Sequence, residues 1–453
     1  MVEKINRLTS YLLKVFVSAV ILACLVYKEA KSNSITLISD EETQSYLAEV
    51  LKPLFNAANL NFDKNKLFIV NDNSLNAFVS DGNYMFVHTG TLMSIDNTNE
   101  LAGILAHETG HITGGHIVRQ KLKMEKMQYV MLGSMIVAGA AAASSGRGDA
   151  AMAVILGAQS SAINSIMNYQ IQEERSADES AIKLLNATKQ STNGLKKFMK
   201  KINKQNVLGG IEETSYFRTH PLTNERIQHF SEASKNNSYS EKSPLDNKLK
   251  MIQAKLSAFL DDTDKVWKIY PLNNKSPHSK YAQSILFFRE GKLKEALNEL
   301  NNLIQFDNSN PYFYELKGQM LFESGQLAES IKSYDKALRM LPNSPLIQTS
   351  LAHALIEYNH TNNDVKKAIK LLNKSNIKNE TPNNWQLLAK AYSLDNNMAY
   401  SYFSAAEFNR LIGNFDTAKK QIEKAKKLVK DKSLQLKISD FDEKIKSNIE
   451  KQQ

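Results

Sequence analysis

Two histidines, His107 and His111, lie four residues apart and enclose Glu108 in the sequence His-Glu-Thr-Gly-His. In an α-helix, residues i and i+4 lie on the same face, so both imidazoles can reach one metal ion. Zinc hydrolysis needs neutral nitrogen ligands and a nearby carboxylate that acts as general base, which is the role Glu108 would take. The spacing predicts a zinc site whose natural target is a peptide carbonyl.

The residues before this motif favour the required helix. Asn97 followed by Glu100 is typical of a capping box, and Leu101, Ile104 and Leu105 form an apolar stripe. The five-residue motif also occurs in unrelated proteins without a catalytic role. A third protein ligand is therefore needed, because catalytic zinc sites use three and leave one position for water.

Three residues are candidates for the third ligand: His116, Glu174 and His220. One class of metalloproteases places a third histidine six residues after the second, but Ile117 stands there in this chain. On a continuous helix, His116 would lie about 140° around the axis from His111, so a structural role is expected for it.

Glu174 is the stronger candidate, because Asp178 follows it four residues later at the start of a helical pattern. One helix face would then offer a ligand carboxylate and a second carboxylate that holds the far N–H of a ligand histidine. The alternative is an exposed helix start, where acidic residues are favoured by the helix dipole.

Together these motifs resemble metallopeptidase family forty-eight. Further matches are Asn76-Ala77-Phe78, the segment 86–90, and Thr219-His220-Pro221 with Arg226. The resemblance implies one zinc ion per chain, with His107, His111 and Glu174 as ligands, Glu108 as base, and Asp178 and Arg226 as supporting residues. It implies that His220 either stabilises the oxyanion or occupies the fourth coordination position as a switch. Both roles suit an imidazole.

A small sheet is expected before the zinc helix. Residues 67–70 read as a buried strand, and residues 76–80 and 84–87 flank the turn signal Asp81-Gly82. An extended substrate can add to a sheet edge through main-chain hydrogen bonds, and residues Asn76, Ala77 and Phe78 are the predicted edge. A hairpin that only packs against the helix would give the same pattern.

The amino terminus predicts export. Lys4 and Arg7 precede an apolar stretch from Val15 to Tyr27, so residues 1–32 are expected to be a signal peptide or a signal anchor. Cys24 is the only cysteine, which excludes an intrachain disulfide, and its surroundings poorly fit a lipidation signal. We expect a periplasmic protein, with an anchored or lipidated form less favoured.

Residues 129–160 are apolar and rich in alanine, glycine and methionine, with a turn-forming segment at 144–149. A helical hairpin is expected here. Its apolar face would contact a membrane surface, a substrate or the repeats, or would close the protease core.

The second half of the chain has a different period. Gly291 and Gly325 are 34 residues apart, as are Phe287 and Leu321. This period is typical of tetratricopeptide helix pairs, whose stacks bind peptides or proteins on a concave surface. About four repeats are expected over residues 275–430, followed by a charged helix or tail over 431–453.

The predicted fold is mainly α: a gluzincin-like α+β zinc peptidase domain with a small sheet over residues 35–268, then an α-solenoid of tetratricopeptide repeats. The net charge of +10 comes without a nucleic-acid recognition motif, so no nucleic-acid partner is expected.

Periplasmic members of the family join the same two parts. The resemblance implies a zinc metalloendopeptidase that acts on misfolded or stalled outer-membrane proteins, with repeats that bind the outer-membrane assembly machinery. The alternative is a latent or weakly active chaperone or scaffold that uses the repeats alone.

Overall fold

The computed structural model describes residues 36–126, 148–208, 220–235, 239–358 and 361–450. The predicted signal segment 1–32 and most of the predicted hairpin 129–160 lie outside these residues. No helix within the described ranges is both long enough and apolar enough to span a membrane.

The first part of the chain combines a small sheet with helices. Its elements are β1 (Leu37–Ile38), α2 (Glu41–Ala57), η2 (Lys64–Lys66), β2 (Leu67–Val70), β3 (Ala77–Ser80), β4 (Tyr84–His88), α3 (Thr89–Ser94), α4 (Thr98–Gly114), α6 (Gly148–Ala187), α7 (Asn193–Leu208), α9 (Asn224–Lys235), α10 (Asp246–Leu260) and α11 (Thr263–Ile269).

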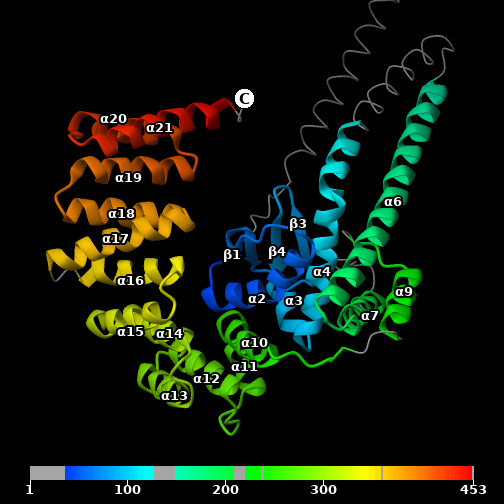
Figure 1. Cartoon of the computed structure of the whole chain (residues 1–453), viewed down its shortest axis with the longest axis horizontal. Helices are drawn as coiled ribbons and strands as arrows, with labels where there is room; N and C mark the ends of the chain where they lie inside the picture. The colour runs from blue at the N-terminus through cyan, green and yellow to red at the C-terminus, as the bar shows by residue number, and fades with distance from the viewer. Residues whose placement is uncertain (1–35, 127–147, 209–219, 236–238, 359–360, 451–453) are drawn as a thin grey trace, which may run out of the picture. The chain divides into compact units, whose positions relative to one another are not determined.

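The second part consists of helices that follow one another in chain order (Figure 1). They are α12 (Pro277–Arg289), α13 (Leu293–Phe306), α14 (Pro311–Glu323), α15 (Leu327–Met340), α16 (Pro345–Tyr358), α17 (Asn362–Lys378), α18 (Pro382–Leu394), α19 (Met398–Leu411), α20 (Phe415–Leu428) and α21 (Lys432–Glu450). The predicted fold class, a mainly helical chain with one small sheet, is confirmed.

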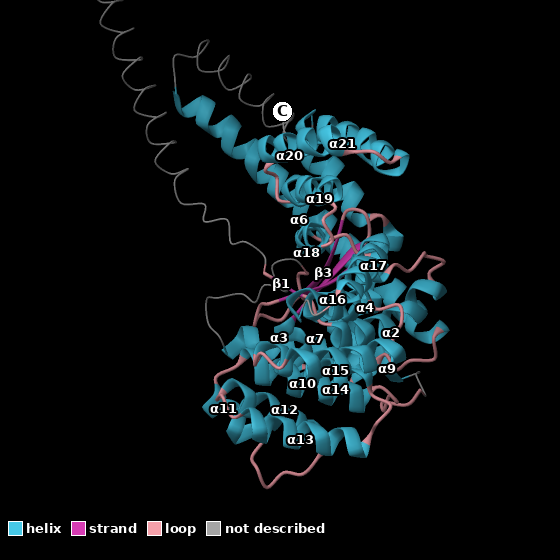
Figure 2. Ribbon diagram, turned by 90° about the vertical axis from the view of Figure 1, so that its left-hand side faces the viewer, coloured by secondary structure: helices cyan, strands magenta, loops and turns pink. Residues whose placement is uncertain are grey.

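The four strands form one sheet in the order β1-β2-β4-β3. They are drawn in magenta in Figure 2. β2 pairs in parallel with β4, while β3 pairs antiparallel with β4 so that Phe78 faces Phe86. The predicted turn between β3 and β4 is present, because Gly82 and Asn83 take positive φ angles of 80° and 63°. β3 is therefore an edge strand of the sheet.

Helix α4 carries the His-Glu-Thr-Gly-His motif and begins as predicted. The Asn97 side chain accepts a hydrogen bond of 3.1 Å from the Glu100 amide. In a capping box the Glu100 side chain would also accept a hydrogen bond from the Asn97 amide. Here the Glu100 carboxylate instead lies 3.1 Å from Lys201 Nζ. Leu101, Ile104 and Leu105 are fully buried, which makes α4 a central helix of the core.

Helices α4 and α6 approach closely at a glycine. A Cβ atom on Gly110 would lie 2.7 Å from the carbonyl oxygen of Ala177, so only glycine allows this distance without a shift. Because Gly110 lies between Glu108 and His111, this contact brings α6 beside the metal-binding motif.

Helix α6 differs from the sequence-based expectation. The sequence predicted a hairpin arm near residue 158 and a separate helix that starts at Glu174, but one continuous helix spans Gly148–Ala187. No proline or turn-forming pair separates residues 158 and 174, so nothing ends the helix. Glu174 and Asp178 therefore lie inside a helix, and the exposed helix start is excluded.

The 34-residue period corresponds to helix pairs. Gly291 between α12 and α13 and Gly325 between α14 and α15 both have positive φ angles, 76° and 75°. Gly318 on α14 leaves room for Tyr334 on α15, since a Cβ atom there would lie 2.7 Å from the tyrosine ring. A small residue facing an aromatic one is the packing that the repeat predicts.

Residues 431–453 were predicted to be a charged helix or a tail, and the helix α21 spans Lys432–Glu450. α21 buries Leu434, Ile438, Phe441 and Ile445 against α19 and α20. These residues are spaced by four, three and four, the pattern of an amphipathic helix that the many lysines obscure.

Candidate active site

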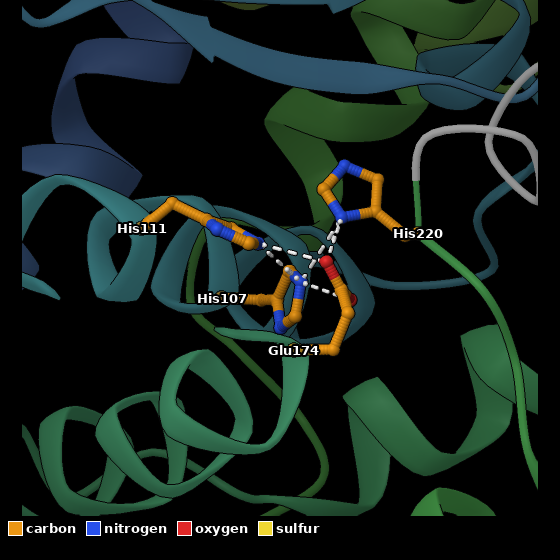
Figure 3. Close-up of side chains that lie close together, drawn as sticks. All are labelled: His107, His111, Glu174 and His220. Atoms are coloured by element: carbon orange, nitrogen blue, oxygen red, sulfur yellow. Dashed lines mark hydrogen bonds and ion pairs between the residues drawn. The ribbon is translucent and has the colours of Figure 1, made fainter. Parts of the chain in front are cut away.

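Four side chains from three segments converge in the core of the first part. His107 and His111 extend from α4, Glu174 from α6, and His220 from the segment that precedes α9 (Figure 3). His107 and Glu174 are 0% and 3% exposed, and His220 is 5% exposed. One ligand atom from each residue lies within 4.8 Å of all the others.

The distances between these atoms fit a tetrahedral metal ion. His107 Nε2 lies 3.1 Å from His111 Nε2 and 3.4 Å from His220 Nδ1. Glu174 Oε1 lies 3.3 Å from His111 Nε2 and 3.0 Å from His220 Nδ1, and Glu174 Oε2 lies 3.3 Å from His107 Nε2. Zinc–ligand bonds of about 2.0–2.1 Å place tetrahedral ligands about 3.3 Å apart. The two-nitrogen, one-carboxylate set with a further imidazole is also a donor set that zinc accepts.

Asp178 and Arg226 hold this cluster in place. Asp178 Oδ1 lies 2.9 Å from His107 Nδ1, which directs the other ring nitrogen of His107 toward the cluster. Arg226 donates two hydrogen bonds of 2.6 and 2.8 Å to Asp178 and contacts Glu174 at 2.8 Å. It also donates to the carbonyl of Pro221, beside His220. Arg226 thus both pairs with Asp178 and anchors the His220 segment.

Glu108 lies between the histidine cluster and the edge strand. It is fully buried, and its Oε1 is 3.5 Å from His220 Nε2. Burial raises the pKa of this carboxyl, while the nearby histidines and the Val79 backbone lower it, and the net shift is upward. Such a carboxylate is suited to accept a proton.

The charges within the cluster favour metal binding. Burial lowers the pKa of His111 to about 3, so this ring is neutral. Burial alone would raise the pKa of Glu174, but His220 and His107 hold it well below its ordinary value. Burial also disfavours the charged form of His107, but Glu174 and Asp178 raise its pKa to about 10. A metal ion would therefore replace one proton at His107.

Comparison with known proteins agrees with this arrangement. Residues 41–234 match the model of peptidase family M48. Residues 41–234 are a peptidase domain of family M48. The chain is therefore a metalloendopeptidase, and its repeats follow the peptidase domain.

Relatives of the chain match different shares of its length. The beta-barrel assembly-enhancing protease of Escherichia coli strain K12 is 23% identical over 90% of this chain and 84% of its own length. The protein of that name from Yersinia pestis is 25% identical over 72% of this chain and 67% of its own. Metalloprotease YcaL of Escherichia coli strain K12 is 30% identical over 40% of this chain and 66% of its own.

Solved tetratricopeptide proteins also match part of the chain. YrrB is 14% identical over 42% of this chain and 91% of its own, with a TM-score of 0.24.

A cleft of about 400 Å³ opens beside the histidine cluster of the peptidase domain. Its walls include Phe78 and Val79 of β3, Glu108 and His111 of α4, and Tyr169 of α6. The edge strand β3 therefore borders the cleft that Glu108 and His111 also line. Val79 and Glu108 line the same cleft, so the edge strand β3 lies beside the Glu108 carboxylate.

The predicted edge residues divide into two groups. Phe78 lines the cleft, but Ala77 is fully buried. The backbone of Asn76 is not available to pair with a substrate. Its amide donates to Thr91, and its carbonyl accepts from both His88 and Thr91. Val79 was not predicted. It belongs to the predicted strand 76–80, and no further signal in the sequence marks it, since strand alternation puts it on the face of the buried Ala77.

His116 was expected to be only structural, on the assumption that α4 continues through it. The helix instead ends at Gly114, and Gly115 takes a left-handed conformation with φ of 65°. His116 Nδ1 then lies 2.9 Å from His111 Nδ1. The pair Gly114-Gly115 is a signal for a helix end that would have indicated this turn.

Proposed function

We propose that the protein is a zinc-dependent endopeptidase with one zinc ion per chain, held by His107, His111 and Glu174. The observation that carries this proposal is the separation of 3.1–3.3 Å between the ligand atoms of these residues, with Glu108 buried beside them. Asp178 and Arg226 orient the ligands.

Zinc, when bound, lowers the pKa of a coordinated water to about 7. Glu108 takes the proton from the attacking water and later delivers it to the leaving amine. The edge of β3 aligns an extended peptide through main-chain hydrogen bonds, so recognition depends little on sequence. Phe78 and Tyr169 give the cleft an apolar wall for a substrate side chain.

The catalytic assignment is tested with unfolded casein. We expect cleavage by the native protein, loss of cleavage after metal chelation, and recovery when zinc is added back. Glu108→Gln should reduce the rate by about 10²–10⁴-fold while zinc remains bound. Glu179→Gln on the exposed face of α6 is the matched control and should leave the rate unchanged. Cleavage that survives both chelation and Glu108→Gln would reject the proposal.

A latent or scaffold state is a second candidate, favoured by the position of His220. Its Nδ1 lies at the fourth corner of the cluster, 3.4 Å from His107 Nε2, where water must bind for hydrolysis. If His220 is a switch ligand, His220→Ala raises basal casein cleavage without loss of zinc. A large fall in the rate would instead assign His220 to oxyanion stabilisation.

The clients we propose are unfolded or misassembled outer-membrane proteins in the periplasm, reached through an amino-terminal export signal. The names of the relatives from Escherichia coli and Yersinia pestis support this substrate class. The repeats would recruit the assembly machinery of the outer membrane, as stacked helix pairs commonly bind proteins. Contact between residues 129–160 and the membrane surface is a further part of the proposal.

The client class is tested by comparing one β-barrel protein in urea-unfolded and detergent-folded form. We expect cleavage of the unfolded form alone, because only an extended backbone can pair with β3. Equal cleavage of both forms would contradict the edge-strand mode of binding.

A further inference from the structure

The turn after α4 returns His116 to the metal cluster. Gly115 ends the helix with a φ of 65°, and its amide donates to the carbonyls of His111 and Ile112. A Cβ atom on Gly114 would lie 2.1 Å from His116 Nε2, so the absent side chain makes room for the ring. The His116 ring is 3% exposed and packs edge-on to His111, with ring centroids 4.9 Å apart.

Two polar contacts connect His116 to both metal-binding helices. Its Nδ1 lies 2.9 Å from His111 Nδ1, and its Nε2 lies 2.9 Å from Glu173 Oε2. Glu173 precedes Glu174 on α6 and accepts two hydrogen bonds of 2.9 Å from Arg119. A continuous path therefore runs from the Glu173 carboxylate through His116 to His111.

Proton positions along this path have one consistent assignment. His111 Nε2 faces the cluster, 3.1 Å from His107 Nε2, and must lack a proton to bind a metal. The proton of His111 is then on Nδ1, which donates to His116 Nδ1. His116 consequently carries its own proton on Nε2, the atom that lies 2.9 Å from Glu173 Oε2. His107 is oriented in the same way by Asp178, with one carboxylate in place of the histidine–carboxylate pair.

We infer that His116 and Glu173 are positioning residues of the metal centre, which fix the tautomer and ring orientation of His111. The inference rests on the proposed role of His111 as a zinc ligand. Three residues of α6 would then serve the metal centre. Glu174 supplies a ligand, Asp178 orients His107, and Glu173 orients His111 through His116.

Zinc affinity tests this inference directly. The zinc dissociation constant is measured by competition with a chelating dye for the native full chain, His116→Ala, His116→Asn and Glu173→Ala. Loss of such a supporting partner costs roughly 10–100-fold in metal affinity, and we expect this increase in the dissociation constant for His116→Ala. Asparagine keeps an acceptor at the position of Nδ1, so His116→Asn should recover part of the affinity.

Two controls separate positioning from general stability. His353 on α16 pairs with Glu357 at 3.4 Å, away from the cluster, and His353→Ala should leave the zinc affinity unchanged. The thermal unfolding midpoint of each metal-free variant reports stability by itself. The visible spectrum of the cobalt-substituted protein should change in His116→Ala, because the geometry at His111 changes.

The outcomes are distinguishable. Zinc binding by the native protein with unchanged affinity in both His116→Ala and Glu173→Ala overturns the inference and leaves the proposed function intact. A native protein that binds no zinc removes both. If His116→Ala does not fold, His116→Asn and Glu173→Ala decide, and weakened binding in Glu173→Ala alone supports the path through His116.

Discussion

Asp178 joins the ligands of the candidate site to the segment that carries His220. Its carboxylate lies beside His107 Nδ1 and accepts two hydrogen bonds from Arg226, which in turn contacts Glu174 and the carbonyl of Pro221. Arg226 lowers the pKa of Asp178 against the effect of burial, so the carboxylate is charged where it faces His107. The ion pair between Arg226 and Asp178 thus orients two proposed ligands, His107 through Asp178 and Glu174 through Arg226.

Asp178→Asn keeps the shape of the side chain but removes its charge. We expect the zinc dissociation constant to rise by roughly 10–100-fold, because His107 loses its anionic partner. Asp335→Asn is the control, since Asp335 pairs with Lys367 at 2.8 Å on the repeats and has no link to the cluster. Equal zinc affinity for the two variants would contradict this account of Asp178.

At the scale of elements, the site depends on the distance between α4 and α6. His107 and His111 belong to one helix and Glu174 to the other, so the three ligand atoms meet only when the helices are in close contact. Gly110 sets that contact, as a Cβ atom would lie 2.7 and 2.9 Å from the backbone of Ala177. Backbone atoms cannot move aside as a flexible side chain can.

Gly110→Ala tests this contact. Alanine is favoured over glycine in a helix by about 1 kcal/mol, but overpacking typically costs about 1–3 kcal/mol. We expect a net loss of unfolding free energy in chemical denaturation, together with weaker zinc binding as α6 shifts. Glu179→Gln, at an exposed position of α6, should leave both quantities unchanged. A stabilised Gly110→Ala protein with native zinc affinity would show that the contact is not limiting.

At the scale of the whole molecule, a buried group of charges connects α2 with the repeat helices. The Tyr281 hydroxyl on α12 donates a hydrogen bond of 2.9 Å to Glu42, and the Ser344 hydroxyl before α16 donates one of 2.6 Å to Glu41. Lys255 on α10 forms ion pairs with Asp40 and Glu42. α10 itself packs one face, including Ile252, in the core of the peptidase domain and another, including Ala258, with α12.

Glu315 on α14 makes this group sensitive to pH. Burial, partly offset by Lys255 and reinforced by Asp40, Glu41 and Glu42, raises the pKa of Glu315 from 4.5 to about 8. The folded protein therefore binds this proton more tightly than the unfolded chain. The stability that Glu315 contributes is present below pH 4.5 and is lost as the pH rises through about 8.

Glu315→Gln removes the charge that forms at high pH. We expect its thermal unfolding midpoint to exceed that of the native protein at pH 8.5, with a difference that decreases toward pH 5, by the sign of this linkage. Glu323→Gln, at an exposed position of the same helix, is the control. A midpoint that is lower than native at pH 8.5 would mean that the ionised Glu315 is a net stabilising partner of Lys255.

Much of the architecture was predictable from local sequence patterns. The four-residue spacing places His107 and His111 on one face of a helix, whatever surrounds it. The Asp81-Gly82 turn predicts the β3–β4 hairpin, and the interval from Gly291 to Gly325 predicts paired helices. Each of these depends on the backbone geometry of a single element or turn, which neighbouring residues largely decide.

The arrangement between elements was decided only by tertiary packing. The sequence offered His116, Glu174 and His220 as third ligands, and the fold brings Glu174 and His220 to the cluster because α6 lies against Gly110 and Arg226 anchors the His220 segment. His116 turns back to His111 because Gly115 takes a left-handed conformation. Periodicity gives the direction of a side chain on its own helix, whereas the distance between two helices depends on which side chains are absent from their interface.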